Sequence, residues 1–379
     1  MATTAPATQP AMPQSDAAGL RAIDVDLHHQ FASWGEVAPY APESLHHRIA
    51  RQSGPPLARH GFRPIGAPFD ETLRPPAKDG CPVHPASDPA WVKDRYLAAR
   101  GIDVAILTGS LTSLGVQPNA DMAAAIARSI NDWTLATWVR PFDCFKGSIL
   151  VAPQDPVQAV AEIDRLGDDP GMVQVLMGSA TETPLGRRNY HPIYEACVRH
   201  QLPLALHLGG EGAGLAPPPT AVGHPTTYFE WYGSLPQVYM AHIMSMVTEG
   251  VFERFPALTV VLYEGGIAWL PHIMWRFDKN WKAQRSETPW VKQRPSAYIV
   301  KHFRSTTYPL ELMREPDQLA QVLAMMDGEH TLLFSGNYPN WALGDPQTML
   351  EGIPEHIRRN VLVENALATY GERLNQPHR

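Results

Sequence analysis

Four apolar segments of the chain each end in side chains that could bind a metal ion. The segment ends are Asp26-Leu27-His28, His207, Glu264 and Ser335-Gly336-Asn337. Residues i and i+2 of an extended strand point to the same side, so Asp26 and His28 can converge on one ion. Imidazoles and carboxylates together suit divalent metals. The coincidence of several such segment ends therefore indicates a metal centre.

Asn337 brings a different chemistry to the fourth segment end. An amide has no proton that titrates in the useful pH range, and it binds metals more weakly than a carboxylate. We include Asn337 among the candidate metal ligands. Proton transfer is assigned instead to Glu264, which carries a carboxylate.

His242 is the next candidate, because its apolar helix leads directly into the segment that ends at Glu264. A single histidine on an apolar helix is more often a hydrogen-bonded core residue than a ligand. Its place in the chain would still let it hold a second ion with Glu264, or share a proton with it. We therefore predict metal-binding and catalytic roles for both residues. His29 should face away from His28, and we expect it either to have a structural role or to support a metal ligand from behind.

An alternation of strand-like and helical segments surrounds these residues. Strands are predicted over residues 20–26, 104–107, 147–152, 172–177, 202–207, 258–264 and 331–335. Helices are predicted over residues 121–139, 156–166, 191–200, 235–252 and 354–370. Asp155 should cap the second helix, with Pro156 in its first turn and Gly167 just past its end. Such alternation indicates a parallel sheet.

The repeating units favour a closed (β/α)8 TIM barrel, an α/β fold, over the alternative of a doubly wound open sheet. No GxGxxG motif follows the first strand, so a dinucleotide site is not indicated. We expect a single domain over residues 20–379 and a disordered tail over residues 1–19. The proline-rich stretch over residues 30–91 is interpreted as an irregular insertion that serves as a lid or contact surface.

Composition narrows the possible partners. The formal net charge of -7 over 379 residues, without a basic run, gives no reason to expect nucleic acid. No apolar run reaches the roughly 18 residues that span a bilayer, so we expect no membrane association. The three cysteines form no CxxC motif, which fits a reducing cytoplasm. These features predict a cytoplasmic protein that acts on a small-molecule substrate.

Two stretches of the chain carry a family resemblance, residues 250–271 (GVFERFPALTVVLYEGGIAWLP) and residues 332–339 (LLFSGNYP). From about Ala22 to Gly371 the chain resembles the amidohydrolase superfamily, in the branch that includes aminocarboxymuconate semialdehyde decarboxylase. Within this branch it is most similar to the amidohydrolase-related dinuclear oxygenases, such as the α-aminoisobutyrate hydroxylase system. Those proteins use pairs of iron or manganese ions.

The resemblance implies roles for the candidate ligands by matching positions. Asp26, His28 and His207 would belong to a first metal ion, and His242 and Glu264 to a second. The implied cofactor is a divalent metal, either one zinc ion or a dinuclear iron or manganese site.

The last strand departs from the family pattern, which reads SDYPHWD at its end. This chain has Gly336, Asn337, Asn340 and Ala342 in that frame. Several acidic or basic groups are therefore missing together, which indicates that the standard reaction of the family is altered here.

Three functions follow from this sequence. The first choice is a subunit of an iron- or manganese-type monooxygenase that acts on a small organic or amino acid. In that case the chain would be an oligomer, as the altered companion of a related barrel subunit. The alternative is a metal-dependent hydrolase or decarboxylase of a small carboxylic substrate. The third is a non-catalytic partner subunit.

Overall fold

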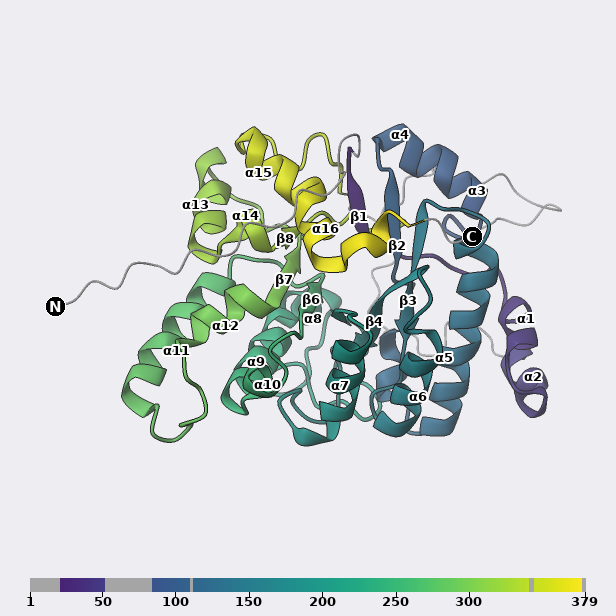
Figure 1. Ribbon diagram of the computed structural model, residues 1–379, viewed down its shortest axis with the longest axis horizontal. Helices are drawn as coiled ribbons and strands as arrows, with labels where there is room; N and C mark the ends of the chain where they lie inside the picture. The colour runs from purple at the N-terminus through teal and green to yellow at the C-terminus, as the bar shows by residue number, and fades with distance from the viewer. Residues whose placement is uncertain (1–20, 52–83, 110–111, 341–343, 377–379) are drawn as a thin grey trace.

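The computed structural model describes residues 21–51, 84–109, 112–340 and 344–376 (Figure 1). The tail predicted over residues 1–19 lies outside the described residues, as does the central part of the insertion, residues 52–83. The start of the insertion is not irregular, because it forms the short helices α1 (Trp34–Val37) and α2 (Glu43–Ala50).

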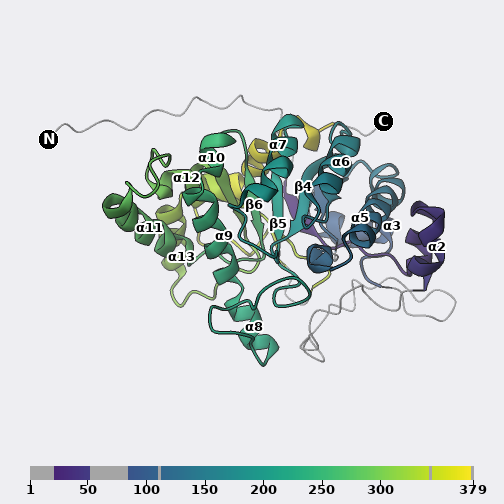
Figure 2. The same cartoon turned by 90° about the horizontal axis from the view of Figure 1, so that it is seen from below.

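Eight parallel strands form the centre of the fold and pair in the order of the sequence. They are β1 (Ile23–Leu27), β2 (Val104–Leu107), β3 (Phe145–Leu150), β4 (Met172–Gly178), β5 (Leu204–His207), β6 (Val260–Tyr263), β7 (Phe303–Thr306) and β8 (Leu332–Leu333). Helices cover the outer side of this sheet (Figures 1 and 2). The architecture confirms the predicted (β/α)8 barrel and excludes the open sheet.

Backbone hydrogen bonds between β1 and the segment after β8 close the barrel. The His28 N–H donates to the Tyr338 carbonyl at 2.8 Å, and the Asn337 N–H donates to the Asp26 carbonyl at 3.1 Å. The closure therefore runs through the two segments that end in Asp26-Leu27-His28 and in Asn337.

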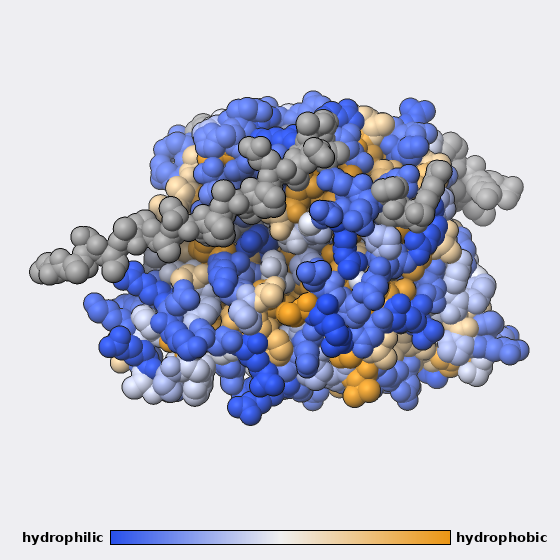
Figure 3. Space-filling model, viewed as in Figure 1, coloured by the Kyte–Doolittle hydropathy of each residue, from blue (hydrophilic) through white to orange (hydrophobic). Residues whose placement is uncertain are grey.

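Helices follow most strands and complete the outer layer. They are α3 (Pro89–Val92), α4 (Ala98–Arg100), α5 (Ala120–Thr134), α6 (Pro156–Leu166), α7 (His191–Arg199), α8 (Tyr228–Ser234), α9 (Pro236–Thr248), α10 (Val251–Arg254), α11 (Leu270–Gln284), α12 (Pro295–His302), α13 (Pro316–Met326), α14 (Gly328–Thr331), α15 (Glu355–Arg359) and α16 (Asn365–Tyr370). No helix of the described chain is long and apolar enough to cross a membrane. On the face shown in Figure 3, hydrophilic residues predominate and apolar residues lie scattered among them.

The start of α6 shows how local sequence positions these helices. The Asp155 carboxylate accepts hydrogen bonds from the N–H groups of Val157 at 3.1 Å and Gln158 at 3.2 Å. Pro156 occupies the first turn and Gly167 follows the last residue, as predicted. The cap satisfies backbone donors that the first turn of a helix leaves without partners.

The sequence predictions differ from the structure at several elements, and no helix was predicted in the stretches that form α11, α12 and α13. Strand β7 was not predicted, because Phe303-Arg-Ser-Thr306 contains a single large apolar residue and so lacks the signal of a buried strand. The helix predicted over residues 235–252 is interrupted, because Gly250 adopts a left-handed conformation with φ 74° between α9 and α10. Glycine adopts this conformation without a steric penalty, and it ends the first helix.

Gly336 lies where the segment after β8 passes closest to β1. Its N–H donates to Oδ1 of Asp24 at 2.7 Å, and the Tyr96 hydroxyl donates to Oδ2 of Asp24 at 2.8 Å. A Cβ atom on Gly336 would overlap both the Tyr96 hydroxyl and the Asp24 carboxylate. The buried Asp24 carboxylate therefore holds this backbone at a distance that excludes any side chain.

We expect Gly336→Ala to lower the free energy of unfolding by about 1–3 kcal/mol, because the new methyl group has no space. Gly233→Ala is the control, since a Cβ atom at Gly233 in α8 meets nothing within 4 Å. That variant should be neutral or slightly more stable. Urea unfolding measures both, and equal losses of stability in the two variants would contradict the steric argument.

Lys146 is a buried lysine in β3, 1% exposed. Its Nζ donates to the Gln376 carbonyl at 2.6 Å, which ties the last part of the described chain to the barrel. Burial lowers the pKa of Lys146 from 10.5 to about 8. The negative charge of Asp143 would raise this pKa, but its effect is smaller than that of burial. Between these two pH values the unfolded chain holds a proton that the folded chain has released, so stability should rise with pH across this window.

We expect Lys146→Met to raise the free energy of unfolding at pH 7 by about 1–3 kcal/mol, because it removes a buried charge. The gain over the unmodified chain should shrink between about pH 8 and 10.5, where the buried amine becomes neutral. Urea unfolding at pH 7 and at pH 10 measures both effects. Lys301→Met, on an exposed residue of α12, is the control. A gain for Lys146→Met that does not change with pH would contradict the assignment.

Candidate metal centre

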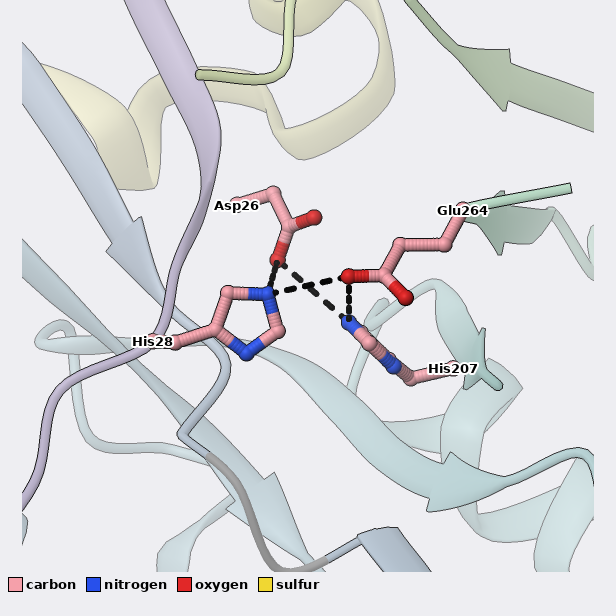
Figure 4. Close-up of side chains that lie close together, drawn as sticks. All are labelled: Asp26, His28, His207 and Glu264. Atoms are coloured by element: carbon pink, nitrogen blue, oxygen red, sulfur yellow. Dashed lines mark ion pairs between the residues drawn. The ribbon is translucent and has the colours of Figure 1, made fainter. Parts of the chain in front are cut away.

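Four side chains converge at the carboxyl ends of β1, β5 and β6 (Figure 4). The potential ligand atoms of Asp26, His28, His207 and Glu264 all lie within 4.8 Å of one another, and all four residues are buried. Nε2 of His28 lies 3.4 Å from Oδ1 of Asp26 and 3.3 Å from Oε1 of Glu264. Nε2 of His207 lies 3.5 Å and 3.9 Å from the same two oxygens.

Backbone carbonyls orient both imidazoles. Nδ1 of His28 lies 2.7 Å from the Gly109 carbonyl, and Nδ1 of His207 lies 2.8 Å from the Leu208 carbonyl. A carbonyl can only accept, so in the neutral ring each Nδ1 carries the proton and each Nε2 keeps its lone pair. Both Nε2 atoms are buried without a hydrogen-bond partner among the described residues. Two lone pairs directed at the same carboxylates fit a bound cation.

Hydroxyl groups fix the carboxylate of Asp26. The Thr108 hydroxyl donates to Oδ1 at 2.7 Å, and the Ser335 hydroxyl donates to Oδ2 at 3.2 Å. The N–H of Asp26 donates to Oδ1 of Asp24 at 3.0 Å. The orientation of this carboxylate is therefore set before any ligand binds.

The electrostatics of the group favour a positive charge at its centre. Burial alone would lower the pKa of His28, but the carboxylates of Asp26 and Glu264 outweigh it and raise that pKa to about 10. Burial alone would raise the pKa of Asp26, but His28 and His207 hold it well below its usual range. Either a proton on His28 or a divalent cation between the four side chains supplies the charge. Two carboxylates and two neutral imidazoles match a divalent ion in charge and in ligand type, so the residues present fit the expected metal.

Asn337 lies beside this group, but its amide oxygen is already engaged. Nδ2 of Asn340 donates to Oδ1 of Asn337 at 2.7 Å. Nδ2 of Asn337 is buried without a partner in the described part of the chain, and an amide N–H group does not bind a cation. The geometry does not support Asn337 as a metal ligand, and that assignment stays a prediction.

His242 is not brought into the group. Its Nε2 lies 2.7 Å from the Ser179 carbonyl, and its Nδ1 accepts from the Leu185 N–H at 3.3 Å. Burial lowers the pKa of His242 to about 4, so the ring is neutral and both nitrogens are used by the backbone. This matches the general expectation for a lone histidine on an apolar helix. The predicted metal-binding and catalytic roles of His242 have no support in this arrangement.

Several contributing groups were not predicted from the sequence. Thr108 and the Gly109 carbonyl follow β2, and no motif marks them. Glu211 lies in the glycine-rich turn after β5, where its carboxylate accepts from the Ser179 hydroxyl at 2.6 Å and from the Gly209 N–H at 2.9 Å. A single acidic residue within Gly209-Gly-Glu-Gly-Ala-Gly214 was the available signal for this loop anchor.

Comparison with protein families matches residues 25–371 to the family described as Amidohydrolase. The chain therefore belongs to the amidohydrolase superfamily. The match confirms the resemblance to the amidohydrolase superfamily, and it includes all four residues of the converging group. The similarity to the dinuclear oxygenases stays a prediction.

Among curated proteins, the chain is similar to gamma-resorcylate decarboxylases. The chain is 26% identical over 224 residues to a gamma-resorcylate decarboxylase of Rhizobium radiobacter, covering 56% of this chain and 66% of that protein. It is 25% identical over 268 residues to the Polaromonas enzyme of the same name, covering 65% of this chain and 75% of that protein. The first alignment thus spans just under two thirds of its relative.

Solved structures share the fold. A dihydroxybenzoic acid decarboxylase from Polaromonas sp. JS666, with bound manganese and 2-nitroresorcinol, matches with a TM-score of 0.65 at 19% identity, covering 94% of this chain and 97% of that one. A 5-carboxyvanillate decarboxylase from Novosphingobium aromaticivorans, also with manganese, matches with a TM-score of 0.65 at 19% identity, covering 95% and 99%. These named relatives are decarboxylases, so the comparisons favour the predicted alternative over the monooxygenase.

We expect His207→Ala to weaken manganese binding by more than the roughly 10–100-fold that loss of a supporting partner costs. The physical reason is that the variant removes one of the two free Nε2 lone pairs. Metal analysis after dialysis and calorimetric titration with Mn²⁺ measure the change. His302→Ala is the matched control, because His302 is equally buried but hydrogen-bonds the Leu258 carbonyl away from the four side chains. Equal manganese binding by both variants would contradict the site.

Proposed function

We propose that this chain is a metal-dependent decarboxylase of an aromatic carboxylic acid. The observation that carries the proposal is the pair of buried Nε2 atoms of His28 and His207, which face the carboxylates of Asp26 and Glu264 and have no hydrogen-bond partner within the described chain. Membership of the amidohydrolase superfamily and the decarboxylase relatives support the reaction class.

Asp26, His28, His207 and Glu264 would hold the divalent metal, for which manganese is the first candidate because two of the similar structures contain it. A bound divalent cation would supply Lewis-acid polarisation of a substrate oxygen. The two carboxylates balance the charge of such an ion. An anionic substrate would therefore approach a centre that is close to neutral rather than strongly negative.

Tyrosines next to Glu264 fit an aromatic substrate. Tyr228 and Tyr232 belong to α8, which protrudes from the barrel in Figure 2, and their rings stack with centroids 5.6 Å apart. Tyr308 lies close enough to Tyr232 to affect the pKa of its hydroxyl group. Burial and the Glu264 carboxylate raise the pKa of Tyr232 and of Tyr308 above 10.0, so both hydroxyl groups remain protonated at neutral pH. The group offers ring faces and hydroxyl groups to an aromatic acid.

Decarboxylation breaks the bond between a ring carbon and the carboxyl carbon, releases carbon dioxide and places a proton on the ring carbon. Asn337 cannot deliver that proton. Asp26 is fully buried and held by two hydroxyl groups, which suits a fixed ligand. Glu264 has the longer side chain and acts electrostatically on Tyr232 and Tyr308. We therefore assign to Glu264 the relay that takes up a proton from solvent and passes it to the ring carbon.

A subunit of a metal-dependent monooxygenase is the second candidate. The observation in its favour is the donor set, because two imidazoles and two carboxylates also suit iron in oxygen chemistry. A dinuclear site would need His242 near Glu264, whereas the described residues gather a single ligand group. One zinc ion, a companion barrel subunit and an oligomeric state remain predictions.

The proposed function is tested with protein loaded with Mn²⁺ and incubated with 2,6-dihydroxybenzoate or 5-carboxyvanillate. We expect release of carbon dioxide and loss of the substrate absorbance without oxygen consumption. Protein stripped of metal by a chelator should be inactive, and Mn²⁺ should restore activity. Substrate-dependent oxygen uptake by iron-loaded protein, without decarboxylation, would instead support the second candidate.

We expect Glu264→Gln to lower kcat by about 100–10,000-fold, because the amide cannot transfer a proton. Metal analysis must accompany the assay, since the same change weakens a metal ligand. Assays at saturating Mn²⁺ separate the two effects. Glu355→Gln, on an exposed residue of α15, is the control. Full activity of metal-loaded Glu264→Gln would show that Glu264 does not transfer the proton.

A further inference from the structure

We propose that Asn337 forms an oxyanion subsite beside the metal centre, in which its Nδ2 donates a hydrogen bond to a carboxylate or phenolate oxygen of the substrate. The inference deepens the proposed function and rests on it for the identity of the anion. It assigns Asn337 a binding role where the family pattern has an acidic group.

A buried donor without a partner carries this inference. Asn337 is 0% exposed, and its Nδ2 has no hydrogen-bond partner in the described part of the chain. Buried polar groups are nearly always paired, because an unpaired donor keeps the cost of its desolvation. A ligand that accepts a hydrogen bond at this position would offset that cost.

The turn after β8 fixes the orientation of the amide. Asn340 donates twice to Asn337, from Nδ2 to Oδ1 at 2.7 Å and from its backbone N–H to the carbonyl at 2.8 Å. The first bond occupies the oxygen of the Asn337 amide and leaves its nitrogen as the available group. Asn340 thus acts as a positioning residue for the proposed donor.

Backbone contacts place Asn337 next to the candidate metal ligand Asp26. The Asn337 N–H donates to the Asp26 carbonyl at 3.1 Å, and the backbone of Asn337 is left-handed with φ 56°. Asparagine tolerates this conformation better than most residues. Because Ser335, two residues earlier, donates to the Asp26 carboxylate at 3.2 Å, the whole segment follows the edge of the ligand group.

Charge explains why an amide suits this position. Asp26 and Glu264 already give the centre two carboxylates. A third carboxylate at position 337 would make the loaded centre negative and would repel an anionic substrate. A neutral N–H donor attracts the same oxygen, and hydrogen bonds to charged acceptors are stronger than neutral ones.

The test measures binding of formate and of 2,6-dihydroxybenzoate to Mn²⁺-loaded protein by titration calorimetry, without reference to turnover. We expect Asn337→Ala to lower the binding affinity for both anions by about 10–100-fold. Its Mn²⁺ affinity should stay within about threefold of the unmodified chain, because no metal ligand is removed. We expect Asn337→Asp to bind the anions more weakly still, through charge repulsion.

Asn340→Ala is the second variant. It leaves Asn337 intact and removes the group that orients it, so anion binding should weaken by about 3–10-fold at unchanged Mn²⁺ affinity. Asn365→Ala is the control for loss of a buried asparagine, because Asn365 donates to the Leu332 carbonyl below the site. That variant should melt at a lower temperature but bind both anions normally.

The outcomes separate this inference from the proposed function. Unchanged anion binding in Asn337→Ala and Asn340→Ala would overturn the subsite, and decarboxylase activity would still stand. Loss of Mn²⁺ from Asn337→Ala would also overturn it, because the amide oxygen would then be a ligand. If formate binding depends on Asn337 but no aromatic acid is decarboxylated, the subsite stands and the proposed function fails. If the unmodified chain binds neither anion, the subsite fails, and the decarboxylation assay decides the proposed function separately.

Discussion

The pairing of β1 with the segment after β8 is the constraint on which both the fold and the site depend. It closes the barrel, and it does so through Asp26 itself. The backbone carbonyl of Asp26 accepts from the Asn337 N–H, while its carboxylate accepts from the Ser335 hydroxyl. A shift of either segment would open the barrel and would also move a candidate metal ligand. The buried Asp24 carboxylate tightens the junction, since it accepts from the N–H groups of both Asp26 and Gly336.

The buried charges of the site make a bound cation the simplest account of its stability. Burying ionised carboxylates is costly unless partners compensate for the lost hydration. The pKa of Asp26 is low because the imidazoles stabilise its negative charge, and the pKa of His28 is about 10 because the carboxylates stabilise a positive charge on its ring. Both shifts show that the site favours an added positive charge. A divalent ion at the Nε2 atoms meets this need with a fixed charge, whereas a proton on His28 meets it in one ring alone. We therefore expect metal binding to stabilise the folded chain, because the ion compensates the buried carboxylates.

The sequence predicted the barrel and the converging residues for a shared physical reason. Parallel strands place their carboxyl ends on one side, so polar residues at those ends must approach one another. Strand β7 was missed because its residues Arg304, Ser305 and Thr306 give no apolar signal. The direction of the His242 ring could not be predicted, because chain proximity to Glu264 does not determine it, and both of its nitrogens contact the backbone. The hydrogen bonds of Thr108 and of the Gly109 carbonyl depend on strand register, which a single sequence does not specify.

The changes after β8 look like a loss of function when they are compared with the family pattern alone. The geometry favours a redistribution, because Glu264 brings a carboxylate to both imidazoles while position 337 carries none. The carboxylates of Asp26 and Glu264 still lie beside the two imidazoles. The uncharged Asn337 lies in the segment whose backbone pairs with Asp26. Backbone carbonyls still orient both imidazoles, and neither Nε2 atom has a hydrogen-bond partner among the described residues. The same geometry weighs against the non-catalytic partner subunit, since four buried ionisable groups without a ligand would only cost stability.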